Sequence, residues 1–267
     1  MKFSKFLPVF FILVITANAF GGWVITMSQT DPDGETSTET LYIQSNRMKV
    51  ADPDEEVVIF DLDKGEMIII NHEKRSYFAG NPSEFMGGAM NAMMKAMEEQ
   101  MKNLPPEQQE MMKEYQKQMG TDAEKSATMK KVKVEIKKMS DKGMVAGYPV
   151  QKFQVYSDGE HKEDLWVTSK ISIKDELDLN KLAEFMEEIK TPGVEEAAYS
   201  YTSEYIRVME QGFPLKTVKY TIAGEDVSEA SKVEKKRIPA SEFAPPEGYK
   251  KVEMEDMMKE MMSGREK

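Results

Sequence analysis

The chain has 267 residues, a net charge of −11 and no cysteine. The excess of carboxylates argues against binding to nucleic acid, which depends on neutralising phosphates with Lys and Arg, and against adsorption to anionic lipid surfaces by charge alone. The lack of cysteine excludes disulfides, thiol catalysis and cysteine-based zinc or iron–sulfur sites.

Residues 1–19 are organised like a secretory signal peptide. Lys2 and Lys5 precede an apolar run, and a pattern of small residues suited to cleavage ends at Ala19. The apolar run is shorter than the roughly 20 residues that span a bilayer. We predict cleavage after Ala19 and a periplasmic or secreted protein with no transmembrane segment and no lipid-anchor cysteine. Residues 20–267 are predicted to form a single domain.

Most of this mature chain is predicted to form short strands separated by turns. Strand-like segments at 40–50, 57–63 and 66–70 are separated by Gly, Pro, Asp or Asn, and the pattern resumes with strict apolar–charged alternation at 130–139. Residues 199–211 are predicted as a further strand. The short spacing favours an antiparallel meander over α/β units, which need a helix between successive strands.

Four segments are predicted as helices. Ser83 is a candidate N-cap for the first, and a Pro105-Pro106 pair suits the start of the second, so that 83–119 would form a helical hairpin inserted between strands. The others are expected over 177–190 and 252–262. The predicted fold class is therefore mainly β (α+β): an antiparallel half-barrel sheet with a Met-rich helical hairpin and further short helices as a lid.

Methionines form one face of the first predicted helix. The chain has 23 methionines, and at 100° per residue six of them fall within an arc of about 100°. These six are Met86, Met90, Met93, Met94, Met97 and Met101. The second helix repeats the pattern with Met111, Met112, Tyr115 and Met119, and 252–262 carries a third stripe.

Three interpretations of the stripes remain open. They could pack on the sheet as core, they could form an adaptable apolar surface for an acyl chain or a protein partner, or their thioethers could bind Cu(I). The two histidines, His72 and His161, lie far from the stripes in the sequence. No nucleophile elbow, zinc-protease motif or phosphate-binding loop occurs. We therefore expect no enzyme, no catalytic residue, no cofactor and no resident metal.

Several motifs together resemble a known group of proteins. They are LYIQSNRMKV…EEVVIFDLDKGEMIIINHEKRSYF at 41–78, VAGYPVQKFQVY at 145–156 with LWVT at 165–168, GFPLKT at 212–217 and FAPPEGYKK at 243–251. They resemble an uncharacterised exported bacterial domain family near the LolA/LolB-type outer-membrane lipoprotein carriers. The chain departs from that pattern in two ways: Pro149-Val150-Gln151 follows the AGY motif without a cysteine, and the Met-rich hairpin looks like an insertion.

The resemblance implies a half-barrel whose helices cover an apolar concave cavity that holds acyl chains. It also implies that Arg47 matches an arginine near the carriers' cavity, with a surface position at a strand end as the alternative. We therefore expect an exported lipid- or lipoprotein-binding protein or carrier, whose partner is an acyl lipid or an acylated protein. The candidate ligand-binding residues are Met86, Met90, Met93, Met94, Met97, Met101, Met111, Tyr115 and Arg47. The alternatives are a structural or protein-interaction module of the cell envelope and a Met-rich copper-binding protein.

Overall fold

The computed structural model describes residues 21–52, 57–102, 105, 132–189, 199–200 and 202–264, with side chains throughout except at 97–102 and 260–264. The predicted signal peptide, and the predicted helix 105–119 beyond its first residue, lie outside the described residues.

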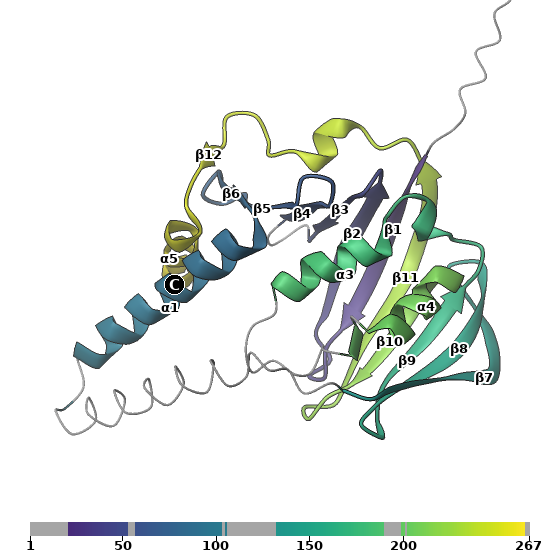
Figure 1. Cartoon of the computed structure of the whole chain (residues 1–267). Helices are drawn as coiled ribbons and strands as arrows, with labels where there is room; N and C mark the ends of the chain where they lie inside the picture. The colour runs from purple at the N-terminus through teal and green to yellow at the C-terminus, as the bar shows by residue number, and fades with distance from the viewer. Residues whose placement is uncertain are drawn as a thin grey trace, which may run out of the picture.

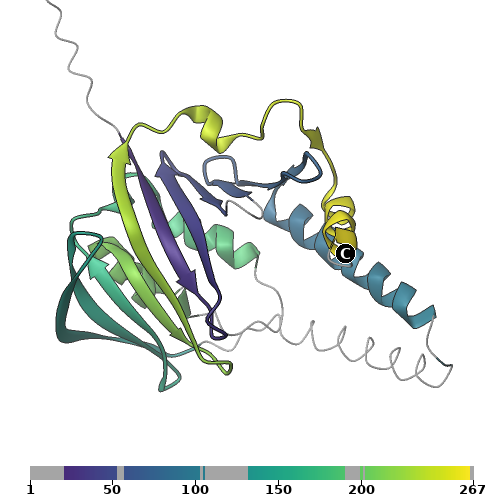
Figure 2. The same ribbon diagram turned by 180° about the vertical axis from the view of Figure 1, so that it is seen from behind.

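The described chain forms one open, twisted sheet of twelve strands in the order β12-β6-β5-β4-β3-β2-β1-β11-β10-β9-β8-β7 (Figures 1 and 2). Every pairing is antiparallel except that of β12 with β6. The predicted mainly β, mostly antiparallel fold class is confirmed. The strands are β1 (Gly22–Thr30), β2 (Thr36–Gln44), β3 (Arg47–Ala51), β4 (Val57–Asp61), β5 (Glu66–Asn71), β6 (Ser76–Gly80), β7 (Val134–Val145), β8 (Tyr148–Ser157), β9 (Glu160–Thr168), β10 (Phe213–Tyr220), β11 (Glu225–Lys236) and β12 (Lys250–Lys251).

Turn chemistry fixes the register of the hairpins. Three of them place two consecutive turn residues at positive φ, as a type I′ turn requires, and this turn matches the right-handed twist of paired strands. The pairs are Ser45-Asn46, Ala146-Gly147 and Asp158-Gly159. Asn, Asp and Gly tolerate this backbone region best. The segment 40–50, predicted as one strand, is divided by the Ser45-Asn46 turn into the end of β2 and the start of β3.

Two of the helices cover one face of the sheet. The helices are α1 (Pro82–Lys102), α3 (Leu179–Glu188), α4 (Ser203–Gln211) and α5 (Met254–Gly264), with 3₁₀ turns η1 (Ile173–Asp175) and η3 (Ala240–Phe243). Figure 1 shows α3 and α4 lying across the sheet, whereas α1 leaves β6 at one side of the sheet and runs away from it. Phe185 of α3 meets Phe60 of β4 edge to face, with ring centroids 5.7 Å apart. Apolar side chains from the sheet and both helices form one core cluster, so this face is filled by the protein itself.

The predicted strand 199–211 is wrong, because most of it forms α4. Tyr205, Ile206 and Val208 favour strands in isolation, which made the segment look extended. In the folded chain, Thr202 caps the helix by accepting a hydrogen bond from the backbone N–H of Tyr205. Ile206 then packs on the main core cluster, while Val208 is buried in a separate cluster on β8 and β9. Tertiary packing on a helical spacing therefore overrides the local preference.

The three other helix predictions that fall within the described residues hold with shifted ends. The first helix begins at Pro82 instead of Ser83, because Asn81 accepts a hydrogen bond from the N–H of Glu84 while the Glu84 carboxylate accepts one from the N–H of Asn81. This reciprocal capping box satisfies two backbone donors at once. The helix predicted over 177–190 runs Leu179–Glu188 after the N-cap Asp178, and the one predicted over 252–262 runs Met254–Gly264.

The opposite face of strands β2–β6 is covered by the chain that leads to α5. Ile238, Phe243 and Tyr249 from this segment pack with apolar side chains of β4 and β5 in a second cluster. The parallel pairing of β12 with β6 then delivers the chain to the start of α5 beside α1. The C-terminal helix is thereby positioned against the first one, although more than 150 residues separate them in the sequence.

Candidate functional site

Helices α1 and α5 pack closely through small residues of α1. A Cβ atom added at Gly88 would lie 2.5 Å from Cβ of Met254 and 3.1 Å from the backbone nitrogen of Glu255. One turn further on, Ala92 is 1% exposed. Beside this contact, Glu255 pairs with Lys95 of α1 at 2.6 Å and with Lys259 at 2.8 Å. The small side of α1 is therefore its buried side.

The methionine stripes of the two helices differ in exposure to solvent. On α5, Met254 and Met257 are 2% and 0% exposed and belong to the main core cluster. On α1, Met90, Met93 and Met94 are 50%, 49% and 54% exposed. We call these three residues the methionine face of α1. It lies away from the Gly88–Ala92 side because positions 90, 93 and 94 are on another arc of the helix.

The structure brings only some of the predicted site residues together. Met86 lies at the start of the same stripe and is half-buried, while Met97 and Met101 belong to α1 but their side chains are outside the described part. Met111 and Tyr115 also lie outside it. Arg47 is on the sheet face covered by the C-terminal segment, with its guanidinium 4.7 Å from the ring centre of Phe243. It does not share a surface with the methionine face.

Gly87 and Gly88 offer a direct test of the α1–α5 contact. We expect Gly88→Ala to lower the melting temperature, because its new Cβ would collide with Met254. The neighbouring Gly87 has no atom within 4 Å of an added Cβ, so Gly87→Ala is expected to raise stability by about 0.5–1 kcal/mol through helix propensity alone. Thermal unfolding of both variants measures the contrast, and equal effects would contradict the proposed close approach.

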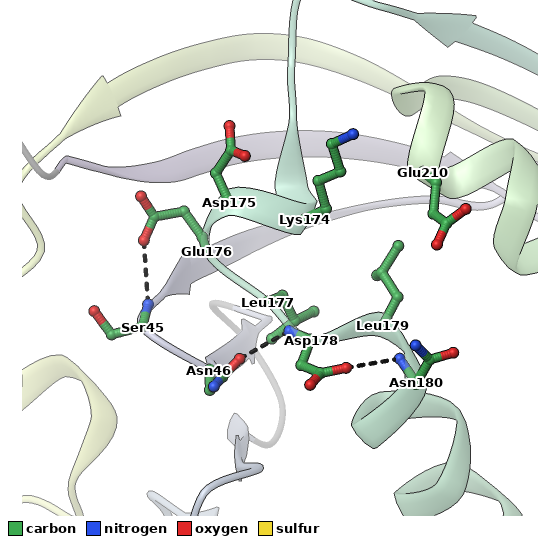
Figure 3. A pocket seen from close by; sticks show the side chains of 10 residues that line it. All are labelled: Ser45, Asn46, Lys174, Asp175, Glu176, Leu177, Asp178, Leu179, Asn180 and Glu210. Atoms are coloured by element: carbon green, nitrogen blue, oxygen red, sulfur yellow. Dashed lines mark hydrogen bonds between the residues drawn. The ribbon is translucent and has the colours of Figure 1, made fainter.

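A shallow hollow of about 410 Å³ lies where the β2–β3 turn meets η1 and the start of α3 (Figure 3). Its lining is mainly polar and charged and includes Lys174 and several carboxylates, among them that of Glu210 on α4. The side-chain oxygen of Asn46 accepts a hydrogen bond from the N–H of Asp178 at 2.8 Å, and the N–H of Ser45 donates to Glu176 at 3.2 Å. These polar groups hydrogen-bond to one another, so the hollow marks the contact between the β2–β3 turn and the start of α3. It does not have the character of an apolar cavity.

Two adjacent carboxylates on β9 occupy contrasting environments. Asp164 is 2% exposed and accepts hydrogen bonds from Lys152 at 2.7 Å, from His161 at 2.8 Å and from the Tyr220 hydroxyl at 3.0 Å. Although burial opposes the change, these donors hold the pKa of Asp164 below its usual value. Burial and the bond to Asp164 raise the pKa of Tyr220 to about 12. The negative charge of Asp164 is therefore stabilised by three hydrogen-bond donors.

Glu163 is the opposite case. It is 1% exposed, and its Oε2 accepts a hydrogen bond from the Tyr205 hydroxyl at 3.2 Å, whereas its Oε1 is buried without a hydrogen-bond partner. Burial raises the pKa of Glu163 to about 7. The sequence did not mark this residue as a candidate. A signal was present, because Glu163 shares its strand parity with the buried Leu165 and Val167, so that its carboxyl points inward.

Within the described ranges, no group of three or more His, Asp or Glu side chains is arranged to hold a metal ion. In the same part of the chain, no helix combines the length and the apolar character needed to cross a bilayer.

Comparison with known proteins gives a family but no assigned activity. A family model described as "Domain of unknown function (DUF4412)" matches residues 79–249. No curated protein matches the chain.

Among solved structures, the chain is similar to PNGF-II in its P21 crystal form, with 12% identity and a TM-score of 0.39 over 91% of this chain and 33% of that one. It is also similar to MucB, with 10% identity and a TM-score of 0.40 over 88% of this chain and 60% of that one. The Pseudomonas aeruginosa MucA/MucB complex gives 10% identity and a TM-score of 0.37, over 87% and 58%. The chain therefore spans about a third of PNGF-II and about three fifths of MucB.

Proposed function

Because the chain belongs to the family described as Domain of unknown function (DUF4412), whose description assigns no activity, we propose its function from its own surfaces: it is an exported binding protein that holds an acyl chain on the methionine face of α1. The observation that carries the proposal is the half-exposed state of Met90, Met93 and Met94 on a helix that already buries its small-residue side. The helix therefore does not need this face for its own packing.

The chemistry of the face favours an acyl chain over a folded protein partner. Methionine is unbranched and polarizable, so its side chains can rearrange around a flexible apolar ligand. Protein interfaces usually add aromatic anchors and several hydrogen bonds, and the described part of this face supplies neither. The nearby Lys95 and Lys259 are both paired with Glu255, which leaves an apolar contact as the main source of affinity.

Burial of an acyl chain provides enough energy without polar recognition. Each buried CH₂ contributes about 0.8 kcal/mol, so a long chain that covers the face along part of its length reaches a measurable affinity. This proposal places the ligand on α1 and not between the sheet and its helices, because core side chains fill that space. It also makes the protein a binding protein and not an enzyme.

Fatty-acid titration tests the proposal. The mature, delipidated protein is titrated with a fluorescent long-chain fatty acid and, separately, with an acylated peptide and its unacylated form. We expect the two acylated probes to bind and the unacylated peptide not to bind. The Met90→Glu/Met94→Glu double variant should weaken binding tenfold or more, because each charge would have to be desolvated by the ligand.

Asn91→Glu is the matched control, since Asn91 is an exposed residue of the same helix outside the stripe. It adds a charge without touching the methionine face and should leave binding within twofold of the wild type. Binding of the acylated peptide alone would identify an acylated protein as the source of the chain. Failure of the wild type to bind both acylated probes, or equal binding by the double variant and the control, would overturn the proposal.

A further inference from the structure

We propose that Glu163 is a proton-operated latch beneath α4: its protonated form lets α4 pack on strands β8–β10, and loss of the proton loosens the helix from the sheet. The residue lies on β9, the third strand from the β7 edge of the sheet, opposite Val155 of β8 and Lys219 of β10. Its carboxyl accepts a hydrogen bond from the Tyr205 hydroxyl of α4 at 3.2 Å, and the Tyr199 hydroxyl lies beside it as well.

The pair Glu163 and Asp164 provides an internal comparison. Both carboxylates are almost fully buried, and they point to opposite faces of the same strand. Asp164 has three donors, one of them a lysine ammonium at 2.7 Å. Glu163 has a buried oxygen with no partner. A buried carboxylate that is not fully paired is costly as an anion and tolerable as a neutral acid.

The charged and titratable groups around Glu163 do not replace the missing partner. On β10, Lys219 is exposed, so water screens its charge, and Asp164 on β9 adds a like charge. Tyr199 and Tyr205, ahead of and within α4, offer neutral hydroxyls. The other charges of α4 do not reach it, since Arg207 pairs with Glu204 at 3.0 Å and Glu210 lines the hollow beside α3. On β8 and β7, the facing residues are Val155 and Ile136.

These surroundings place the change of charge in the physiological range. Burial is the largest influence and raises the pKa of Glu163 to about 7; Lys219 and the tyrosine hydroxyls oppose the rise and Asp164 adds to it. A modest change around neutral pH therefore changes the charge of a group directly under the helix.

When Glu163 is ionised, we expect α4 to separate from the sheet while the sheet itself stays intact. Strand β9 is hydrogen-bonded along its length to β8 on one side and β10 on the other. The nine-residue α4 is held mainly by side chains such as Val208 in the β8–β9 cluster and Met209 in the main core cluster. Elements held by few contacts open first. Loosening α4 would expose apolar core on the helix-covered face of the sheet.

Hydrogen–deuterium exchange tests the latch on the mature protein. Protection of the α4 amides, corrected for the pH dependence of intrinsic exchange, is compared at pH 5 and pH 8. In the wild type we expect it to fall by roughly one to two orders of magnitude, because each pH unit between the open and closed pKa values favours opening tenfold. Helix α5, which packs against α1 and β6 away from Glu163, is the internal control and should change little.

The variant Glu163→Gln is expected to keep the same α4 protection at both pH values, since the amide cannot ionise. Glu204→Gln, which removes a half-exposed carboxylate on α4 itself, is the matched control and should behave like the wild type. A wild-type α4 whose protection is constant, or falls only together with that of α5, would overturn the latch even if Glu163→Gln failed to fold. An equal fall in Glu163→Gln would overturn it as well.

Discussion

Met257→Ala is expected to lower the free energy of unfolding by about 2–5 kcal/mol, the cost of removing a large buried side chain from a core that relaxes only partly. Met257 is completely buried and belongs to the cluster that also contains Phe78 of β6 and Met67 of β5. Its loss would leave a cavity where α5 joins the sheet edge and α1. Chemical denaturation monitored by far-UV circular dichroism measures the change.

Met94→Ala is the matched control on α1. Met94 is 54% exposed, and alanine favours helix more than methionine does, so its effect on stability should stay within about 0.5 kcal/mol. Met257 and Met94 both belong to methionine stripes, so the difference between their effects on stability separates a buried stripe from an exposed one. A loss at Met94 comparable to that at Met257 would show that the methionine face of α1 is core, and it would also remove the basis for the acyl-chain proposal.

Glu163→Gln is expected to stabilise the protein at pH 8 by up to about 3 kcal/mol, at 1.4 kcal/mol per pKa unit. Burial raises the pKa of Glu163 to about 7 from its ordinary value of 4.5. Below pH 4.5 the carboxyl is protonated in both the folded and the unfolded state, so the variant gains nothing there. Between pH 4.5 and 7 the unfolded wild type loses its proton while the folded wild type keeps it, and wild-type stability falls as the pH rises.

Denaturant unfolding at several pH values from 4 to 8 measures this difference between wild type and variant. We expect the difference to grow steadily up to about pH 7 and then to level off. Asp164→Asn should show the opposite sign, because the Asp164 anion is stabilised by Lys152, His161 and Tyr220, and its loss should destabilise the protein at neutral pH. A Glu163→Gln difference that is constant with pH would mean that Glu163 is ionised normally in the folded protein.

Much of the sheet was predictable because strand signals are local. Alternation at 130–139 indicates a strand directly, since side-chain direction has a period of two. The turn signals were read less completely, because the segment predicted as one strand over 40–50 contains the Ser45-Asn46 turn. The prediction for 199–211 failed because strand signals are local. Its Tyr and β-branched residues indicate a strand locally, while the packing of Ile206 and Val208 on two different clusters requires a helix.

The candidate site was predictable only in outline. The stripe from Met86 to Met94 follows from the helical period, whereas its exposure depends on which side of α1 meets α5, and that contact is set by Gly88 and a residue more than 150 positions later. The burial of Glu163 likewise depends on α4. Because 199–211 was predicted as a strand, the sequence indicated no helix that could cover Glu163. The local pattern indicates which way a side chain points, whereas the extent of its burial depends on contacts with other segments.

The sequence by itself determined the mainly antiparallel β architecture, the presence of α1, α3 and α5, and the grouping of methionines on single helical faces, because these depend on residue spacing within one segment. Only the tertiary structure decided that the methionines of α5 are core while those of α1 stay half-exposed, that 203–211 is helical, and that Glu163 is buried with one unpaired oxygen. The physical reason is that burial is a property of contacts between segments, and here the decisive contacts join β9 to α4 and α1 to α5.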